Sequence, residues 1–135
     1  MTKFLNNTSL ISYAVKEYEK KSFHDISEIN LIHGQNPIQW LNTYGLSYPT
    51  EFRTIVESNN IDNFLLKLLA DKEHSNKVIQ FENLLFVTVK VLKTESSSLE
   101  FEQMVFISST HFLWSIQERS GDHFNWIRER IENNK

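Results

Sequence analysis

The spacing of hydrophobic residues changes along the chain and predicts where strands and helices lie. In the second half, four segments rich in Val, Ile, Phe and Trp predict strands at 77–81, 84–92, 101–107 and 112–117. The links between these segments are short, which is typical of antiparallel neighbours. The second half therefore predicts an antiparallel meander.

The first half carries shorter hydrophobic runs between polar ones. Segments 9–15 and 38–41 predict two further strands. The charged run 16–21 indicates a turn and a solvated edge, and the polar run 42–45 indicates a second turn. Strands from both halves are thus available for one sheet.

Three segments have helical spacing instead. One follows Ser47 or Thr50 as its cap and places Phe52 and Ile55 on one side, and another follows Asp122 near the end of the chain. The clearest helix is predicted over 61–70, with Asn60 as its N-cap. Its hydrophobic stripe repeats at i, i+3, i+4, i+7 and i+8 and comprises Ile61, Phe64, Leu65, Leu68 and Leu69.

The order of these elements predicts the fold class. A strand, a short helix over 26–30 that Asp25 can cap, and a second strand precede two helices, a run of strands and a final helix. This order indicates an α/β fold with helices packed on a mixed β-sheet. The sequence contains no internal repeat and no long linker. We expect a single domain over residues 1–135.

Alternation within the strand at 84–92 divides its side chains between two faces. Leu85, Val87 and Val89 lie on one side, and Leu84 and Phe86 lie on the other. We expect the aliphatic first set to face the central helices. The face bearing Leu84 and Phe86 is then covered in part by the last helix, and we expect self-association through the apolar patch that remains.

Composition excludes several classes of function. The 135 residues carry a net charge of −3 and no cysteine, so a clustered basic face for nucleic acid, a disulfide and a zinc–thiolate site are not expected. The three glycines are too scattered for a phosphate-binding loop. Glu100 and Glu102 indicate a solvated strand edge. With no nucleophile–base pair to name, the chain is not expected to be an enzyme and has no catalytic residues.

Three blocks of sequence resemble the cytoplasmic N-terminal domain of CorA-type magnesium transporters. The first, 76–91, leads from a Lys-Val pair through an acidic turn into a long apolar strand, and the second comprises 101–107 and 112–118. The third, 121–131, matches every fixed position of the family pattern Gly-Asp-x-Phe-x-x-x-Arg-Glu-Arg-Ile. A weaker match, to Trp-Ile-Asn-x-x-Gly-Ile, lies at 40–46.

The resemblance implies an α/β domain on the cytoplasmic side of the cell membrane, within a funnel-shaped homopentameric ion channel. Its partners there are the stalk and transmembrane helices, which come later in the family's chains together with a Gly-Met-Asn motif at the pore mouth. None of these is found up to Lys135. We expect a soluble fragment of an integral membrane protein, without the conduction machinery.

One departure from the family concerns metal binding. CorA-type proteins often place a Glu-Asp pair late in the helix before the Lys-Val block, where it helps to bind a regulatory magnesium ion between subunits. The matching positions here are Lys67 and Leu68. Asp71 and Glu73 are weak substitutes as metal ligands, with a solvated loop as the competing interpretation. No tightly bound cofactor is expected, and Mg²⁺ is expected to bind weakly.

The function implied by the resemblance is that of a cytoplasmic regulatory domain of a CorA-like divalent-cation channel, for magnesium or for cobalt and nickel. Two alternatives stay open: a zinc transporter of the same superfamily, and a stand-alone soluble binding or scaffold domain. A divalent cation is the expected ligand, and nucleic acid is not an expected partner.

Overall fold

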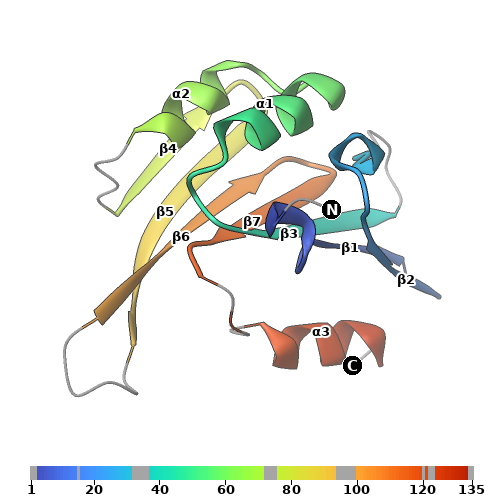
Figure 1. The fold of residues 1–135 in the computed structure, drawn as a ribbon. Coiled ribbons are helices and arrows are strands. Elements are labelled where there is room, and N and C mark those ends of the chain that lie inside the picture. The colour runs from blue at the N-terminus through green and yellow to red at the C-terminus, as the bar shows by residue number, and fades with distance from the viewer. Residues whose placement is uncertain are drawn as a thin grey trace.

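The computed structural model describes residues 3–14, 16–31, 37–71, 76–93, 100–119, 121 and 124–133 (Figure 1). Within these ranges, seven strands form one sheet in the order β2-β1-β3-β7-β6-β5-β4. The strands are β1 (Ser9–Ala14), β2 (Glu17–Ser22), β3 (Ile38–Tyr44), β4 (Lys77–Phe81), β5 (Leu84–Lys93), β6 (Glu100–Ser108) and β7 (Phe112–Gln117).

The sheet is mixed because one pair of neighbours runs parallel. In that pair, β3 and β7, Leu41 lies opposite Trp114 and Thr43 lies opposite Ile116. The other neighbouring strands are antiparallel, and β4 to β7 form the meander that the sequence predicts. The predicted α/β fold class with a mixed sheet is therefore confirmed.

Helices lie on both faces of the sheet (Figure 1). The helices α1 (Pro49–Ser58) and α2 (Phe64–Ala70) pack on one face, called here the α1/α2 face. The helix α3 (Asn125–Glu132) lies on the opposite face, called the α3 face. Two short 3₁₀ turns, η1 (Lys3–Leu5) and η2 (Ile26–Glu28), complete the described elements. Among the described residues, no helix has the length and apolar character needed to cross a bilayer.

The hydrophobic core lies between the sheet and the α1/α2 face. Trp114 of β7 is completely buried there, and its ring meets the Phe52 ring of α1 edge-on at 5.8 Å between centroids. The indole N–H of Trp114 donates a hydrogen bond to Thr43 Oγ1 at 3.0 Å. The core cluster includes Leu41, Ile55, Leu65, Phe86, Val105, Ile107 and Ile116.

The predicted assignment of the two faces of β5 is wrong. Phe86 is 0% exposed and belongs to the core under α1 and α2, whereas its neighbour Leu85 is 37% exposed on the α3 face. Both sets are apolar, so alternation along β5 separates them without showing which one the helices cover. The register settles it, because Phe86 pairs with Ile107, and Ile107 pairs with Trp114. The expectation that α3 covers Leu84 and Phe86 and leaves an apolar patch open beside them is therefore wrong, whereas self-association stays a prediction.

Two polar runs that indicate turns are strands in the structure. The charged run forms β2, an edge strand whose side chains are mostly exposed on both faces. Charged Glu and Lys side chains on an edge strand keep other strands from pairing there, so an apolar pattern is not required. The polar run after Leu41 continues β3 to Tyr44, because the buried Asn42 side chain finds hydrogen-bond partners on β7.

The central helix has the predicted buried stripe but a later start. Leu65 and Leu68 are buried, which confirms the register of the helix. The helix begins at Phe64, since Asn60 has a positive φ of 54° and the Asp62 carboxylate accepts a hydrogen bond from the Phe64 N–H. Phe64 itself is 42% exposed and packs edge-on against Phe81.

Candidate functional site

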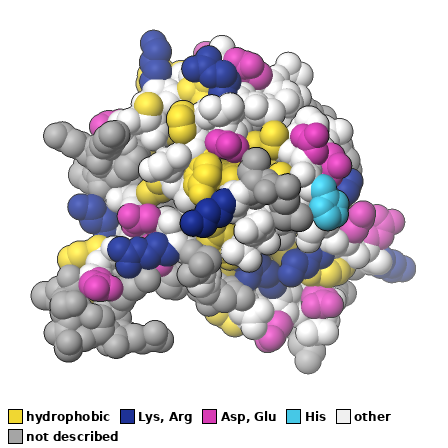
Figure 2. Space-filling model, in the orientation of Figure 1, with side chains coloured by type: hydrophobic (Ala, Val, Ile, Leu, Met, Phe, Trp, Pro, Cys, Tyr) yellow, Lys and Arg dark blue, Asp and Glu magenta, His cyan; other side chains and the backbone are white. Residues whose placement is uncertain are grey.

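A groove between α1 and α2 is the larger of the two cavities described here. It has a volume of about 660 Å³, within the range typical of ligand pockets. The groove is lined by Leu46, Ser47, Pro49, Phe52, Arg53, Leu66, Leu69, Ala70, Asp71 and Glu118. Figure 2, drawn in the orientation of Figure 1, shows hydrophobic side chains between acidic and basic ones near the middle of the visible face.

Asp71, one of the two candidate metal ligands, lies at the rim of this groove, where α2 ends. Its carboxylate is half exposed and forms an ion pair with the Lys77 ammonium group at 3.3 Å. A cation that used Asp71 would therefore compete with Lys77. Glu73, the second candidate, lies outside the described residues, so the pair stays a prediction.

The two positions that replace the family's acidic pair point in different directions. Lys67 is exposed on α2, whereas Leu68 is buried in the core. A cation approaching this helix from solvent therefore meets an ammonium group. Among the residues that the structure describes, no group of three His, Asp or Glu side chains is arranged to hold a metal ion.

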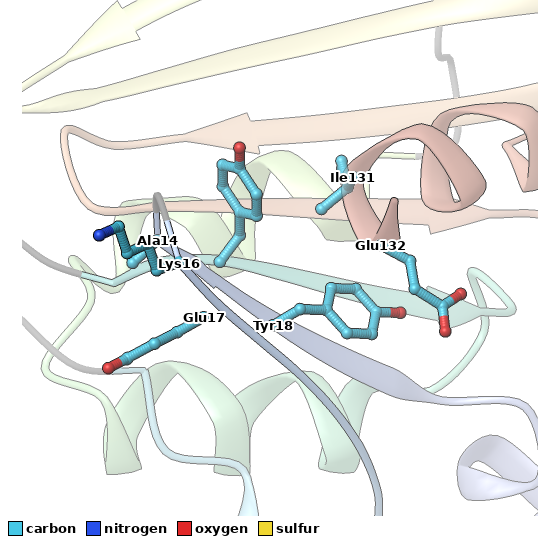
Figure 3. A pocket seen from close by; sticks show the side chains of 7 residues that line it. Ala14, Lys16, Glu17, Tyr18, Ile131 and Glu132 are labelled. Carbon is cyan, nitrogen blue, oxygen red and sulfur yellow. The ribbon is translucent and has the colours of Figure 1, made fainter. Parts of the chain in front are cut away.

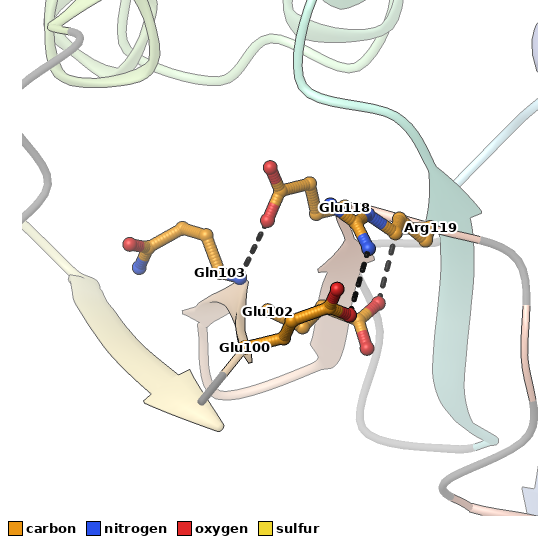
Figure 4. A network of polar contacts seen from close by, with 5 residues as sticks. All are labelled: Glu100, Glu102, Gln103, Glu118 and Arg119. Carbon is orange, nitrogen blue, oxygen red and sulfur yellow. Dashed lines mark hydrogen bonds and ion pairs between the residues drawn. The ribbon is translucent and has the colours of Figure 1, made fainter. Parts of the chain in front are cut away.

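The acidic residues at the start of β6 differ from the expected solvated edge. Glu100 is exposed and lies 3.9 Å from the Arg119 guanidinium, but Glu102 is 1% exposed and accepts a hydrogen bond from the Arg119 N–H at 3.0 Å (Figure 4). The carboxylate of Glu118 accepts a hydrogen bond from the Gln103 N–H at 2.7 Å. These bonds tie the end of β7 to β6, so these carboxylates have structural roles.

A smaller cavity of about 170 Å³ lies between α3 and the β1–β2 turn (Figure 3). It is lined by Tyr13, Ala14, Lys16, Glu17, Tyr18, Ile131 and Glu132. Burial raises the pKa of the Tyr18 phenol, and the Glu132 carboxylate raises it further, while the Arg128 guanidinium acts against both. The cavity is small for an organic ligand but large enough for several water molecules.

Sequence reasoning identifies Asp71 but not the groove around it. From the sequence, Phe52 and Leu69 are predicted only as core positions of two separate helices. In the structure, both line the groove together with Leu46 and Glu118. The only sequence signal was that Glu118 closes the second block of the CorA resemblance.

Comparison of sequences agrees with the resemblance. The chain is 24% identical over 128 residues to the cobalt/magnesium transport protein CorA of Thermotoga maritima, and the match covers 93% of this chain. The chain spans only 36% of the length of that curated relative. No protein-family model matches the sequence.

Solved structures show the same fold. The full-length CmaX protein superposes with a TM-score of 0.73 at 12% identity, over 98% of this chain and 40% of CmaX. The ZntB cytoplasmic domain of Vibrio parahaemolyticus gives 0.70 at 10% identity, over 94% of this chain and 50% of that one. The complete CorA magnesium transporter of Methanocaldococcus jannaschii gives 0.66 at 13% identity, over 99% and 38%.

These likenesses bear on the whole chain, since each match covers more than nine tenths of it. The chain has the fold of the CorA-type soluble domain, which confirms the resemblance that its sequence motifs indicate.

Proposed function

We propose that the chain is the cytoplasmic regulatory domain of a CorA-like divalent-cation channel that carries magnesium, cobalt or nickel. The main support is the sequence match to a CorA protein over nearly the whole chain, combined with the shared fold. The conducting part and the fivefold assembly would be supplied by further segments of the same protein. In this proposal the domain catalyses no reaction.

The regulatory site of such a domain would differ from the usual one. With an exposed Lys67 and a buried Leu68 at the positions of the acidic pair, cytosolic Mg²⁺ has no carboxylate to bridge to on this part of α2. Asp71, balanced by Lys77, is the nearest described carboxylate on the same helix end. We therefore propose that closure by Mg²⁺ is weaker in this protein than in a channel with the acidic pair.

A zinc transporter of the same superfamily is the second candidate. In structure, the chain is as similar to the ZntB cytoplasmic domain, with a TM-score of 0.70, as it is to the CorA transporter, with a TM-score of 0.66. The structural likeness therefore supports both candidates equally. A stand-alone binding domain is the third possibility and belongs to a different class.

The gene beyond Lys135 separates these proposals. Two apolar spans with Gly-Met-Asn after the first favour a transporter, and a stop codon directly after Lys135 favours the stand-alone domain. If the spans are present, the full-length protein can be placed in liposomes that contain a Mg²⁺- or Zn²⁺-sensitive dye. We expect Mg²⁺ influx with weak inhibition by internal Mg²⁺. Influx of Zn²⁺ without Mg²⁺ would favour the zinc transporter instead.

A further inference from the structure

A chain of side-chain hydrogen bonds crosses the α3 face from β3 to β7. The Trp40 indole N–H donates to Ser115 Oγ at 2.8 Å, and Ser115 donates to Asn42 Oδ1. Asn42 Nδ2 then donates to Gln117 Oε1 at 3.1 Å, and Gln117 Nε2 donates to the Gly121 carbonyl oxygen at 3.1 Å. An indole can only donate, so the serine must accept from it and pass its own proton onward, which fixes the direction of every later bond.

This hydrogen-bond chain anchors the segment before α3 to the sheet. Asn42, Ser115 and Gln117 are each at most 1% exposed, so breaking any of these bonds leaves a buried polar group unpaired. The last acceptor is the backbone of Gly121, to which the Tyr44 hydroxyl also points at 3.5 Å. The peptide group of Gly121 is therefore held firmly to β3 and β7.

Beyond this anchor, side chains of Phe124 and α3 pack against the sheet. The Phe124 ring lies 5.6 Å from the Trp40 ring and 6.1 Å from the Phe106 ring, between centroids. The Arg128 guanidinium lies 5.3 Å from the centre of the Trp40 ring. None of the eight residues of α3, all of them described, is fully buried, and Trp126 is 60% exposed.

The far end of α3 is not closely packed. Ile131 and Glu132 lie above the cavity of about 170 Å³ that separates them from Tyr13 and Tyr18 (Figure 3). A helix of eight residues has too few internal hydrogen bonds to persist alone in water. Its presence therefore depends on contacts with the sheet, among them those of Phe124 with Trp40 and Phe106 and that of Arg128 with Trp40.

We propose that α3 is a releasable strap, hinged at the anchored Gly121 and docked on Trp40, that leaves and rejoins the α3 face while the sheet stays folded. Trp40 has two roles in this device, as first donor of the anchor and as the surface on which the strap docks. Release uncovers Trp40, on which Phe124 and Arg128 pack.

Hydrogen exchange on the whole chain tests the strap. The amides of Arg128 to Glu132 should exchange at least about 100-fold faster than those of β7, yet more slowly than in an unfolded peptide. Arg128→Ala should speed exchange further in α3 alone, by about 3-fold or more, because it removes the cation–π contact with Trp40 and the other interactions of the guanidinium. The matched control is Arg130→Ala, which removes the same charge from an exposed position of the same helix.

A cross-link provides the second arm. Because the chain has no cysteine, Tyr18→Cys with Ile131→Cys creates the only thiol pair, on opposite sides of one cavity. Joining the two thiols with a short bismaleimide should slow exchange in α3 to within about 10-fold of β7. The proposal is overturned if α3 exchanges as slowly as β7 without the link, if it exchanges at unfolded rates, or if the two arginine variants behave alike.

Discussion

The Trp114 indole N–H and the Thr43 hydroxyl oxygen form a hydrogen bond of 3.0 Å between two fully buried side chains of neighbouring strands. Thr43→Val keeps the shape of the side chain but removes the acceptor. The stranded indole N–H should lower the free energy of unfolding by about 1–3 kcal/mol, measured by urea denaturation.

A double-mutant cycle separates this hydrogen bond from packing. In a Trp114→Phe background, Thr43→Val should cost clearly less than in the wild type, because no indole N–H remains to be left unpaired. Equal costs in both backgrounds would show that the bond contributes nothing of its own.

The neighbours Leu85 and Phe86 provide a direct test of which face of β5 is covered. Leu85→Lys should change the free energy of unfolding by less than about 0.5 kcal/mol, because its side chain is 37% exposed and can extend into solvent. Phe86→Ala should cost about 3–5 kcal/mol, because it leaves a cavity in the core. Thermal or urea unfolding of the two variants measures both costs. A larger cost for Leu85→Lys than for Phe86→Ala would support the assignment of faces made from the sequence.

Magnesium should bind the isolated chain weakly. Lys67 repels a cation on α2, and the Asp71 carboxylate is balanced by Lys77 at 3.3 Å. Calorimetric titration with Mg²⁺ should show no saturable binding in the micromolar range. Lys77→Ala, which removes this ion pair, should raise the affinity relative to the wild type, and adding Asp71→Asn should abolish that gain. Saturable micromolar binding by the unaltered chain would contradict the prediction.

The pKa of Tyr18 predicts a loss of stability at high pH. Burial and then the Glu132 carboxylate raise this pKa above its ordinary value of 10.0, so the native state favours the neutral phenol. The stabilisation is complete below the unfolded pKa and is lost as pH rises through the folded pKa. Above pH ~10, the wild type should lose stability more steeply than Tyr18→Phe in urea unfolding. Glu132→Gln removes one cause of the raised Tyr18 pKa. In this variant the loss of stability should therefore begin at a lower pH than in the wild type.

The strands of the meander were predictable because their signals are local. Between Lys77 and Gln117, runs of β-branched and aromatic residues are separated by short polar links, and the structure places strands on all four. The stripe of α2 was equally clear, since Leu65 and Leu68 recur at helical spacing. The C-terminal blocks of the CorA resemblance lie in this well-predicted half.

The errors arose where pairing across the chain overrides a local pattern. Asn42 reads as a turn residue, but partners on β7 keep it inside a strand. Leu85 and Phe86 are both apolar, and only the position of α1 and α2 decides which one is buried. Glu102 reads as an edge carboxylate, whereas the Arg119 N–H holds it under the surface. Each answer depends on a residue distant in sequence.

The parallel seam between β3 and β7 has a consequence for how the chain folds. On one side of it lie β2, β1 and β3, and on the other lie β7, β6, β5 and β4, so each half-sheet is built from strands that are near one another in sequence. Across the seam, Asn42 and Ser115 are 73 residues apart. Closing so long a loop lowers the conformational entropy of the chain before contacts across the seam can offset this loss. We therefore expect the halves to form early and their joining to limit the folding rate, so that a nascent chain completes its sheet only after β7 has left the ribosome.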